Sequence, residues 1–253
     1  MKRKWIFLIM TLLVTMCGVA GIVTKREKKR AEEEHRHIPY GPYEAFFKRP
    51  LDVILSITAL IILSPVLLVT AVVVKVKLGS PVIFTQERPG MIDPKTGKEK
   101  IFKLYKFRTM TDERDENGNL LPDEQRLTDF GKKLRSTSID ELPELWNILK
   151  NDMSVVGNRP LLTTYLDRYS ERQRHRHDVK PGLTSLSASK KRNLASWDEK
   201  FEDDLRYVDK ITFLGDLKIM LDTVKIVLSK KGISSATSTT MEEFFGSQKE
   251  EEC

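Results

Sequence analysis

The chain has 253 residues, which is enough for one domain of moderate size with additional segments. Its formal net charge of +7 favours anionic partners such as membrane lipids or phosphorylated substrates. We expect no nucleic-acid partner, because the sequence has no zinc-ligand spacing and no strand of interleaved aromatic and basic residues. The two cysteines, Cys17 and Cys253, cannot form a disulfide framework, which favours a reducing compartment.

The first apolar segment runs from Trp5 to Val23 without a charged residue. It is long enough to cross a hydrocarbon core of about 30 Å. The heavier basic cluster follows it, so the positive-inside rule places the downstream chain in the cytoplasm. We therefore predict an N-terminal transmembrane anchor over residues 1–24, with a cleaved signal peptide as the alternative, and a charged linker over 25–45.

The second apolar segment, residues 51–74, differs from a plain spanning helix. Asp52 lies at its start, and Ser64-Pro65 interrupts its middle, where proline removes a backbone donor. Basic residues flank both ends, which favours a segment that enters the bilayer, bends and returns, with Ser64 supplying a hydroxyl to the freed backbone. A kinked spanning helix is equally compatible with this pattern. The flanking basic residues are Lys48, Arg49, Lys75 and Lys77.

The soluble part begins with a predicted β-hairpin. Residues 81–88 and 100–110 are rich in β-branched and aromatic residues, and residues 93–97 between them form a turn cluster. The polar, acidic segment 111–123, with its Asn117-Gly118 turn, is predicted to be a mobile surface loop.

A helix is predicted to begin at Asp140, which suits the N-cap position, with Pro143 in the first turn. Its apolar stripe has the spacing i, i+3, i+4 and i+7. The stripe consists of Leu142, Leu145, Trp146 and Leu149.

Three further helices are predicted over residues 161–175, 197–208 and 214–228. The last is amphipathic, so it could lie on a membrane surface or cover a protein core.

Four charged features lie in the same part of the chain, and each has an ordinary structural explanation. The acidic pair Asp140-Glu141 suits a helix start, and basic runs are most often solvated faces. Together they suit phosphoryl chemistry, since a carboxylate can attack phosphorus while Mg²⁺ and arginines hold the phosphate oxygens. The other three features are Lys132-Lys133 with Arg135, the turn Gly157-Asn158-Arg159-Pro160, and the basic run from Arg172 to His177.

Ordered sequence blocks between Phe46 and Leu228 resemble the monotopic phosphoglycosyl transferase family, also called bacterial sugar transferases. The blocks are Lys48-Arg49-Pro50-Leu51-Asp52, Ser64-Pro65, Gln86-Glu87-Arg88, the run from Tyr105 to Met110, the run from Leu134 to Leu145, Asp152-Met153-Ser154, the run from Gly157 to Leu161, Lys180-Pro181-Gly182, Ser196-Trp197, Phe201, Asp209 and Asp216-Leu217-Lys218.

The resemblance implies an α+β fold in a monotopic membrane protein: a proline-broken re-entrant helix hairpin, surface amphipathic helices and a small sheet. The catalytic domain would cover residues 46–234, and a polar tail residues 235–253. It also implies transfer of a sugar 1-phosphate from a UDP-sugar to a polyprenol phosphate, namely undecaprenyl phosphate. This reaction would release UMP and start a cell-surface glycan at the cytoplasmic face of the bacterial inner membrane, with downstream glycosyltransferases as further partners.

The family's functional positions map onto named residues of this chain. Asp140 would be the nucleophile of a covalent phosphosugar intermediate and Glu141 its partner, the two holding Mg²⁺. The residues expected to bind phosphate or substrate are Arg135, Arg159, Lys48, Arg49, Arg88 and Arg192. Those expected to shape the membrane hairpin and its polar mouth are Asp52, Ser64 and Pro65.

The chain departs from the family pattern at two places. Asn158 stands where the family has the first proline of Gly-Pro-Arg-Pro, which removes a φ restriction. Residues 183–191 lack two glycines, a tryptophan and a glutamine of the family pattern, so we expect this loop to take another path. A catalytically silent family member that assists a polysaccharide assembly complex is therefore the alternative hypothesis.

Overall fold

The computed structural model describes residues 37–190, 195–229 and 243–246. The predicted 1–24 anchor, Arg192 and most of the 235–253 tail lie outside the described residues. One compact unit contains residues 39–92 and 99–253, and the hairpin turn 93–98 belongs to a separate unit. All contacts described below lie within the large unit.

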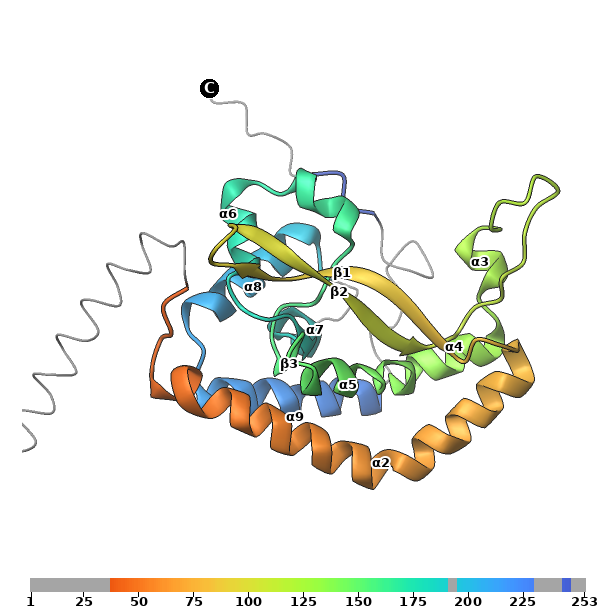
Figure 1. Ribbon diagram of the computed structural model, residues 1–253, viewed down its shortest axis with the longest axis horizontal. Helices are drawn as coiled ribbons and strands as arrows, with labels where there is room; N and C mark the ends of the chain where they lie inside the picture. The colour runs from red at the N-terminus through yellow and green to blue at the C-terminus, as the bar shows by residue number, and fades with distance from the viewer. Residues whose placement is uncertain (1–36, 191–194, 230–242, 247–253) are drawn as a thin grey trace, which may run out of the picture. The chain divides into compact units, whose positions relative to one another are not determined.

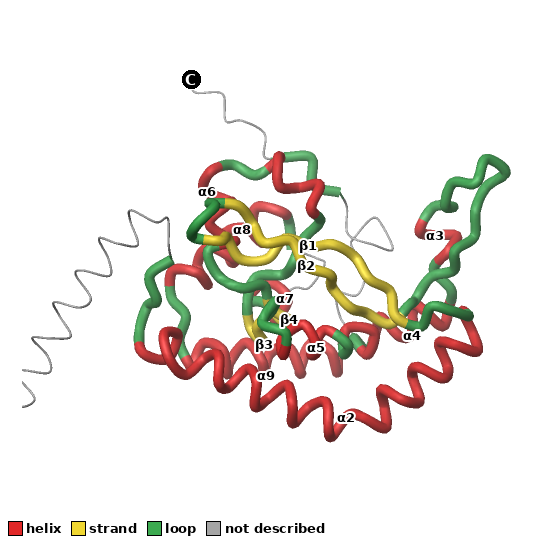
Figure 2. Tube along the Cα trace, in the orientation of Figure 1, coloured by secondary structure: helices red, strands yellow, loops and turns green. Residues whose placement is uncertain are grey.

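The longest helix, α2 (Lys48–Leu78), follows a π-helical turn at Tyr43–Phe47. Together they form 36 helical residues apolar enough to cross a membrane, and little of the apolar stretch is buried. Helix α2 bends near its middle (Figures 1 and 2). Pro65 lies inside the helix and cannot bond to Ile61, four residues earlier, so the Ser64 hydroxyl donates to that carbonyl at 2.8 Å. Ser64 thus supplies the expected hydroxyl and the helix bends, but α2 is one continuous helix through Pro65 and is not broken there.

Both ends of α2 contact the same compact unit. Near the first end, Asp52 accepts hydrogen bonds from the Ser154 hydroxyl at 2.8 Å and from the following backbone N–H at 2.9 Å. Near the other end, Val74 is fully buried and forms a cluster with Phe107 and Leu134. Two polar bonds and an apolar cluster therefore fix the two ends of α2 to one folded body.

The predicted hairpin is confirmed, although its first strand extends to residue 93 instead of 88 and its second begins and ends earlier than the predicted 100–110. It consists of β1 (Ile83–Asp93) and β2 (Lys98–Phe107). In the segment after β2, Asp115 accepts hydrogen bonds from the backbone of Asn117 and Asn119. Gly118 adopts a φ of +80°, which confirms the predicted turn.

A second sheet joins two short parallel strands, β3 (Ser154–Val156) and β4 (Gly182–Thr184). The Gly157 N–H donates to the Thr184 carbonyl at 3.0 Å just beyond the paired residues. A side chain at Gly182 would meet the Gly157 backbone at 2.1 Å, so the approach of these two segments requires glycine.

The predicted start of a helix at Asp140 is wrong. Asp140 lies in a 3-10 helix, η2 (Ile139–Glu141), and the following helix α5 (Glu144–Leu149) begins later. The predicted apolar stripe is also shifted, because Trp146 is exposed while Glu144 and Asn147 are buried. The buried Asn147 side chain bonds to the backbone of β2, and this long-range contact overrides the apolar pattern.

The single helix predicted over residues 161–175 is also wrong. The structure has a 3-10 helix at Thr163–Arg168, the helix α6 (Glu171–Arg174) and another 3-10 turn at His175–His177. Tyr169 is extended, and Ser170 starts a new helix through a capping box with Gln173.

The last two predicted helices are confirmed as α8 (Trp197–Asp209) and α9 (Phe213–Ser229). Within the predicted polar tail, Phe244 is buried against Tyr165 and Phe201. The remaining short helices are α3 (Asp123–Arg126), α4 (Asp129–Ser136) and α7 (Leu186–Lys190). In Figure 1, α2 and α9 lie along the lower side of the large unit, and the hairpin and α8 lie above them.

Candidate active site

A cavity of about 950 Å³ opens between the hairpin, η2 and the turn that follows β3. Its charged lining includes two adjacent carboxylates, four lysines and several arginines. The altered segment also reaches it, through Leu183, Thr184, Ser187 and Ala188. The charged lining residues used below are Arg88, Lys106, Arg135, Asp140, Glu141, Glu144, Arg159, Arg176 and Asp204.

Asp140 presents an unengaged carboxylate to this cavity. The residue before η2, Ser138, is left-handed with a φ of +55°, which ends α4 and turns the chain into η2. Asp140 is buried, yet its carboxylate forms no hydrogen bond or ion pair with the described residues. Burial, then the neighbouring Glu141, raises the pKa of Asp140 to about 6. Most of the carboxylate is therefore ionised at neutral pH.

Glu141 is held by two cations. Its Oε1 accepts from Lys106 Nζ at 2.8 Å and from Arg159 Nη2 at 2.7 Å. Burial opposes its ionisation, but Arg159 and Lys106 together hold the pKa of Glu141 well below its usual range. Adjacent residues thus differ: Glu141 is anionic and fixed, while Asp140 is available.

Lys106 and Glu144 were not among the predicted site residues. Lys106 Nζ lies 3.1 Å from Glu144 Oε1 as well as contacting Glu141. Burial raises the pKa of Glu144 to about 7. Strand alternation could have identified Lys106, because residues 102 and 104 on the same face of β2 are buried core residues.

Three of the predicted arginines meet at the cavity. Arg135 donates to the Thr109 hydroxyl at 3.1 Å, and Arg88 donates to the Pro160 carbonyl at 3.2 Å. Burial, then the positive charge of Arg159, lowers the pKa of Arg88 to about 10, and its buried Nε has no partner among the described residues. Such a cluster of guanidinium groups, with Arg159 exposed and the other two partly buried, favours an anionic ligand.

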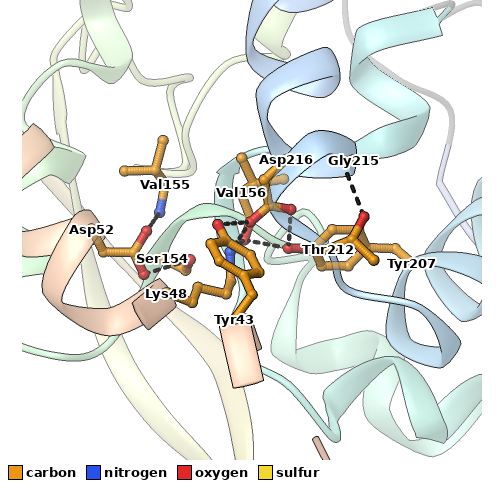
Figure 3. A network of polar contacts seen from close by, with 10 residues as sticks. All are labelled: Tyr43, Lys48, Asp52, Ser154, Val155, Val156, Tyr207, Thr212, Gly215 and Asp216. Atoms are coloured by element: carbon orange, nitrogen blue, oxygen red, sulfur yellow. Dashed lines mark hydrogen bonds and ion pairs between the residues drawn. The ribbon is translucent and has the colours of Figure 1, made fainter. Parts of the chain in front are cut away.

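Lys48 lies outside the cavity lining and bonds to protein groups instead (Figure 3). Its Nζ lies 2.6 Å from Asp216 Oδ2 and donates to the Val156 carbonyl at 2.9 Å. The Tyr43 and Tyr207 hydroxyls donate to the same buried carboxylate at 2.8 Å and 3.0 Å. This network joins the start of α2 to β3 and α9.

Arg49 and Asp52 also contact protein rather than the cavity. Arg49 donates to the carbonyls of Ile148 and Leu149 at 2.7 and 3.2 Å, which satisfies the last turn of α5. Phosphate binding by Lys48 and Arg49 stays a prediction, and Arg192 lies outside the described residues.

A magnesium ion fits this donor set only with help from a substrate. Among the described residues, no group of three or more histidine, cysteine, aspartate or glutamate side chains is arranged to hold a metal. Mg²⁺ is commonly bound through one or two carboxylates together with substrate phosphates. The free Asp140 carboxylate and the adjacent Glu141 suit that mode of binding.

A family model for bacterial sugar transferases matches residues 43–230, which include α2, the hairpin, η2 and the arginine turn. The chain belongs to the bacterial sugar transferase family. The membership that the sequence blocks indicated is confirmed, and the protein is a transferase.

Several curated relatives resemble this transferase. The uncharacterized sugar transferase EpsL of Bacillus subtilis is 52% identical over 200 residues, covering 79% of this chain and 96% of the relative. An Aeromonas hydrophila UDP-N-acetylgalactosamine-undecaprenyl-phosphate N-acetylgalactosaminephosphotransferase is 33% identical, covering 76% of this chain and 46% of the relative. A Klebsiella pneumoniae UDP-glucose:undecaprenyl-phosphate glucose-1-phosphate transferase is 38% identical, covering 74% and 41%. The chain thus spans less than half of the latter two relatives.

Proposed function

We propose that this transferase moves a sugar 1-phosphate from a UDP-sugar to undecaprenyl phosphate and releases UMP. The observation that carries the proposal is the free Asp140 carboxylate beside a fixed Glu141 and a cluster of arginines, in one cavity. Relatives named for UDP-sugar and undecaprenyl-phosphate chemistry support the two substrate classes.

In the first half-reaction, an Asp140 carboxylate oxygen attacks the phosphorus that carries the sugar. The bond from this phosphorus to the bridging oxygen breaks, and UMP leaves with that oxygen. Arg159, Arg135 and Arg88 hold the phosphate oxygens, which offsets the repulsion between an anionic nucleophile and an anionic donor.

In the second half-reaction, an oxygen of the lipid phosphate attacks the same phosphorus. The bond to the Asp140 oxygen breaks, so the carboxylate is regenerated and a lipid-linked pyrophosphoryl sugar forms. Lys106 and Arg159 keep Glu141 anionic and in place throughout. Mg²⁺, held by Asp140 and Glu141 together with the substrate phosphates, would neutralise phosphate charge when bound.

We propose that α2 re-enters the membrane instead of crossing it. A helix that crossed the bilayer would separate its two ends by about 30 Å of hydrocarbon. Here Asp52 and Val74, near opposite ends, both contact one folded body, and the helix bends near its middle (Figure 1). The catalytic unit then lies on the cytoplasmic face of the inner membrane, where UDP-sugars are available.

Helix α9 provides a second membrane contact in this proposal. Its exposed leucines and valine are spaced at three and four residues along one face, while the opposite face packs against α7. The exposed residues are Leu214, Leu217, Leu221, Val224 and Leu228.

The test is UMP release from a panel of UDP-sugars with Mg²⁺ and undecaprenyl phosphate, for the wild type and Asp140→Asn. We expect the wild type to release UMP from at least one donor and Asp140→Asn to release none. Wild-type silence across the panel, with cellular glycan that survives Asp140→Asn but not deletion of the chain, would establish the silent assembly role instead.

A further inference from the structure

We propose that Arg176, together with Asp204, is a positioning residue that fixes the backbone of the phosphate-binding Arg159. The inference rests on the proposed function of the Arg159 cavity. Arg176 lies in the 3-10 turn after α6, and Asp204 lies in α8, so neither belongs to the elements that carry the carboxylates.

The contacts between Arg176 and the turn run in both directions. Arg176 Nη2 donates to the Arg159 carbonyl at 2.7 Å, while Asn158 Nδ2 donates to the Arg176 carbonyl at 2.8 Å. Arg176 and Asp204 are each 2% exposed. Arg176 Nε and Nη2 both donate to Asp204 Oδ2, at 2.9 and 2.7 Å, so the guanidinium has a fixed orientation.

Arg176 completes the support of this turn. The Asn158 carbonyl accepts from the Gly182 N–H at 2.9 Å, and the Pro160 carbonyl accepts from Arg88 at 3.2 Å. With Arg176 on the middle carbonyl, three consecutive carbonyls are each held by a donor from another segment. Arg159 is therefore presented to Glu141 from a backbone with little freedom to shift.

The contacts of Arg176 with the Arg159 turn also account for Asn158 at the position of the family's proline. The amide side chain supplies a hydrogen bond to Arg176 where a proline ring would restrict φ. The backbone of this turn is thus restrained by a side-chain hydrogen bond in place of a proline ring.

The decisive variant is Arg176→Lys, which keeps a positive charge beside Asp204 but lacks the fork that reaches two acceptors. We expect UMP release to fall by about 10²-fold, as for a small displacement of a catalytic group, when activity is measured well below the melting temperature of the variant. The matched control is Arg174→Lys, because Arg174 pairs with Glu99 at the surface and lies outside the cavity lining. This control should retain wild-type activity.

A double-mutant cycle with Arg159→Met separates positioning from direct substrate binding. If Arg176 acts through Arg159, the double variant is no slower than Arg159→Met alone. Additive losses, or wild-type activity in Arg176→Lys, would overturn the proposal. Should Arg176→Lys fail to fold, Asn158→Ala removes only the reciprocal bond, and it should slow the enzyme only when Arg159 is present.

UMP affinity, measured by calorimetry on the full chain, makes the two proposals distinguishable. Arg176→Lys should weaken UMP binding in the Arg159 protein and leave it unchanged in Arg159→Met. If the wild type shows no turnover but UMP affinities follow this pattern, the proposed function is refuted and the positioning role of Arg176 is not. If Arg176→Lys and the wild type bind UMP with equal affinity, the positioning role is refuted.

Discussion

Asp140 and Glu141 are adjacent carboxylates whose surroundings give them different properties. Glu141 accepts hydrogen bonds from Lys106 and Arg159, whereas Asp140 is buried without a direct partner among the described residues. The pKa of Asp140 is accordingly raised to about 6, and that of Glu141 is lowered. The sequence could predict the pair but not this division, because Lys106 reaches it from a strand 35 residues away.

Replacement of Lys106 by methionine should slow UMP release by at least about tenfold, the range of a single electrostatic contact in a site. The variant leaves Glu141 and Glu144 without their shared cation, and the pKa of Asp140 rises further because Lys106 normally lowers it. The pH profile of UMP release should therefore move to higher pH. Lys103→Met is the matched control, since Lys103 is exposed on the same strand. An unchanged rate and profile in Lys106→Met would contradict this role.

His177 should make stability depend on pH. Burial, then the charge of Arg176, holds the pKa of His177 well below 6.5, and its Nδ1 lies 3.2 Å from the Gly90 carbonyl. The folded protein thus favours neutral His177, so its stabilisation is present above pH 6.5 and is lost as the pH falls towards the folded pKa. His177→Asn, which keeps a donor without titrating, should flatten the fall in melting temperature between pH 7 and pH 5. A fall in melting temperature of the same steepness in His177→Asn and the wild type would contradict this role.

At the scale of elements, the sequence predicted the helices and strands whose formation depends on neighbouring residues. The bend near Ser64-Pro65, the β-hairpin, α8 and α9 are found where the sequence indicates them, although α2 continues through the proline. The helix over 161–175 was wrong, because a Ser170 capping box and an extended Tyr169 divide it. The parallel strands β3 and β4 position the turn that carries Arg159. Each has three residues and they pair across 28 positions, so no local periodicity predicts them.

Helix α2 allows a direct test of its path through the membrane. A single cysteine at Tyr40, before α2, in a chain with Cys17 and Cys253 replaced by serine, should react with an impermeant maleimide from the same membrane face as a cysteine at Arg172, after α2. Both positions are exposed, and Arg172 lies in the catalytic unit. Labelling of the two from opposite faces would show that α2 crosses the bilayer.

At the scale of the whole molecule, the exposed apolar surfaces belong mainly to α2 and α9, and the charged cavity lies in the same unit. The family could be predicted from ordered sequence blocks, and the family comparison confirms it. The cavity wall formed by residues 183–188 could not be predicted, because that segment departs from the family pattern and forms β4 and α7.

The α9 stripe should contribute to membrane attachment. Leu221→Gln replaces an exposed apolar side chain on the stripe, so partition into neutral phosphatidylcholine vesicles should fall several-fold, in line with the loss of buried apolar area. Lys218→Gln, an exposed change on the same helix, is the control and should partition as the wild type does. Equal partition of both variants would assign membrane attachment to other segments.

The central claim is a covalent phosphosugar on Asp140, and exchange of labelled UMP into UDP-sugar without any lipid acceptor tests it most directly. If UMP leaves before the acceptor arrives, label must return to the donor through the enzyme-bound phosphosugar. We predict exchange by the wild type with the donor it uses, and none by Asp140→Asn. Turnover with acceptor but no exchange without it would mean direct transfer between the two substrates, and would contradict the account.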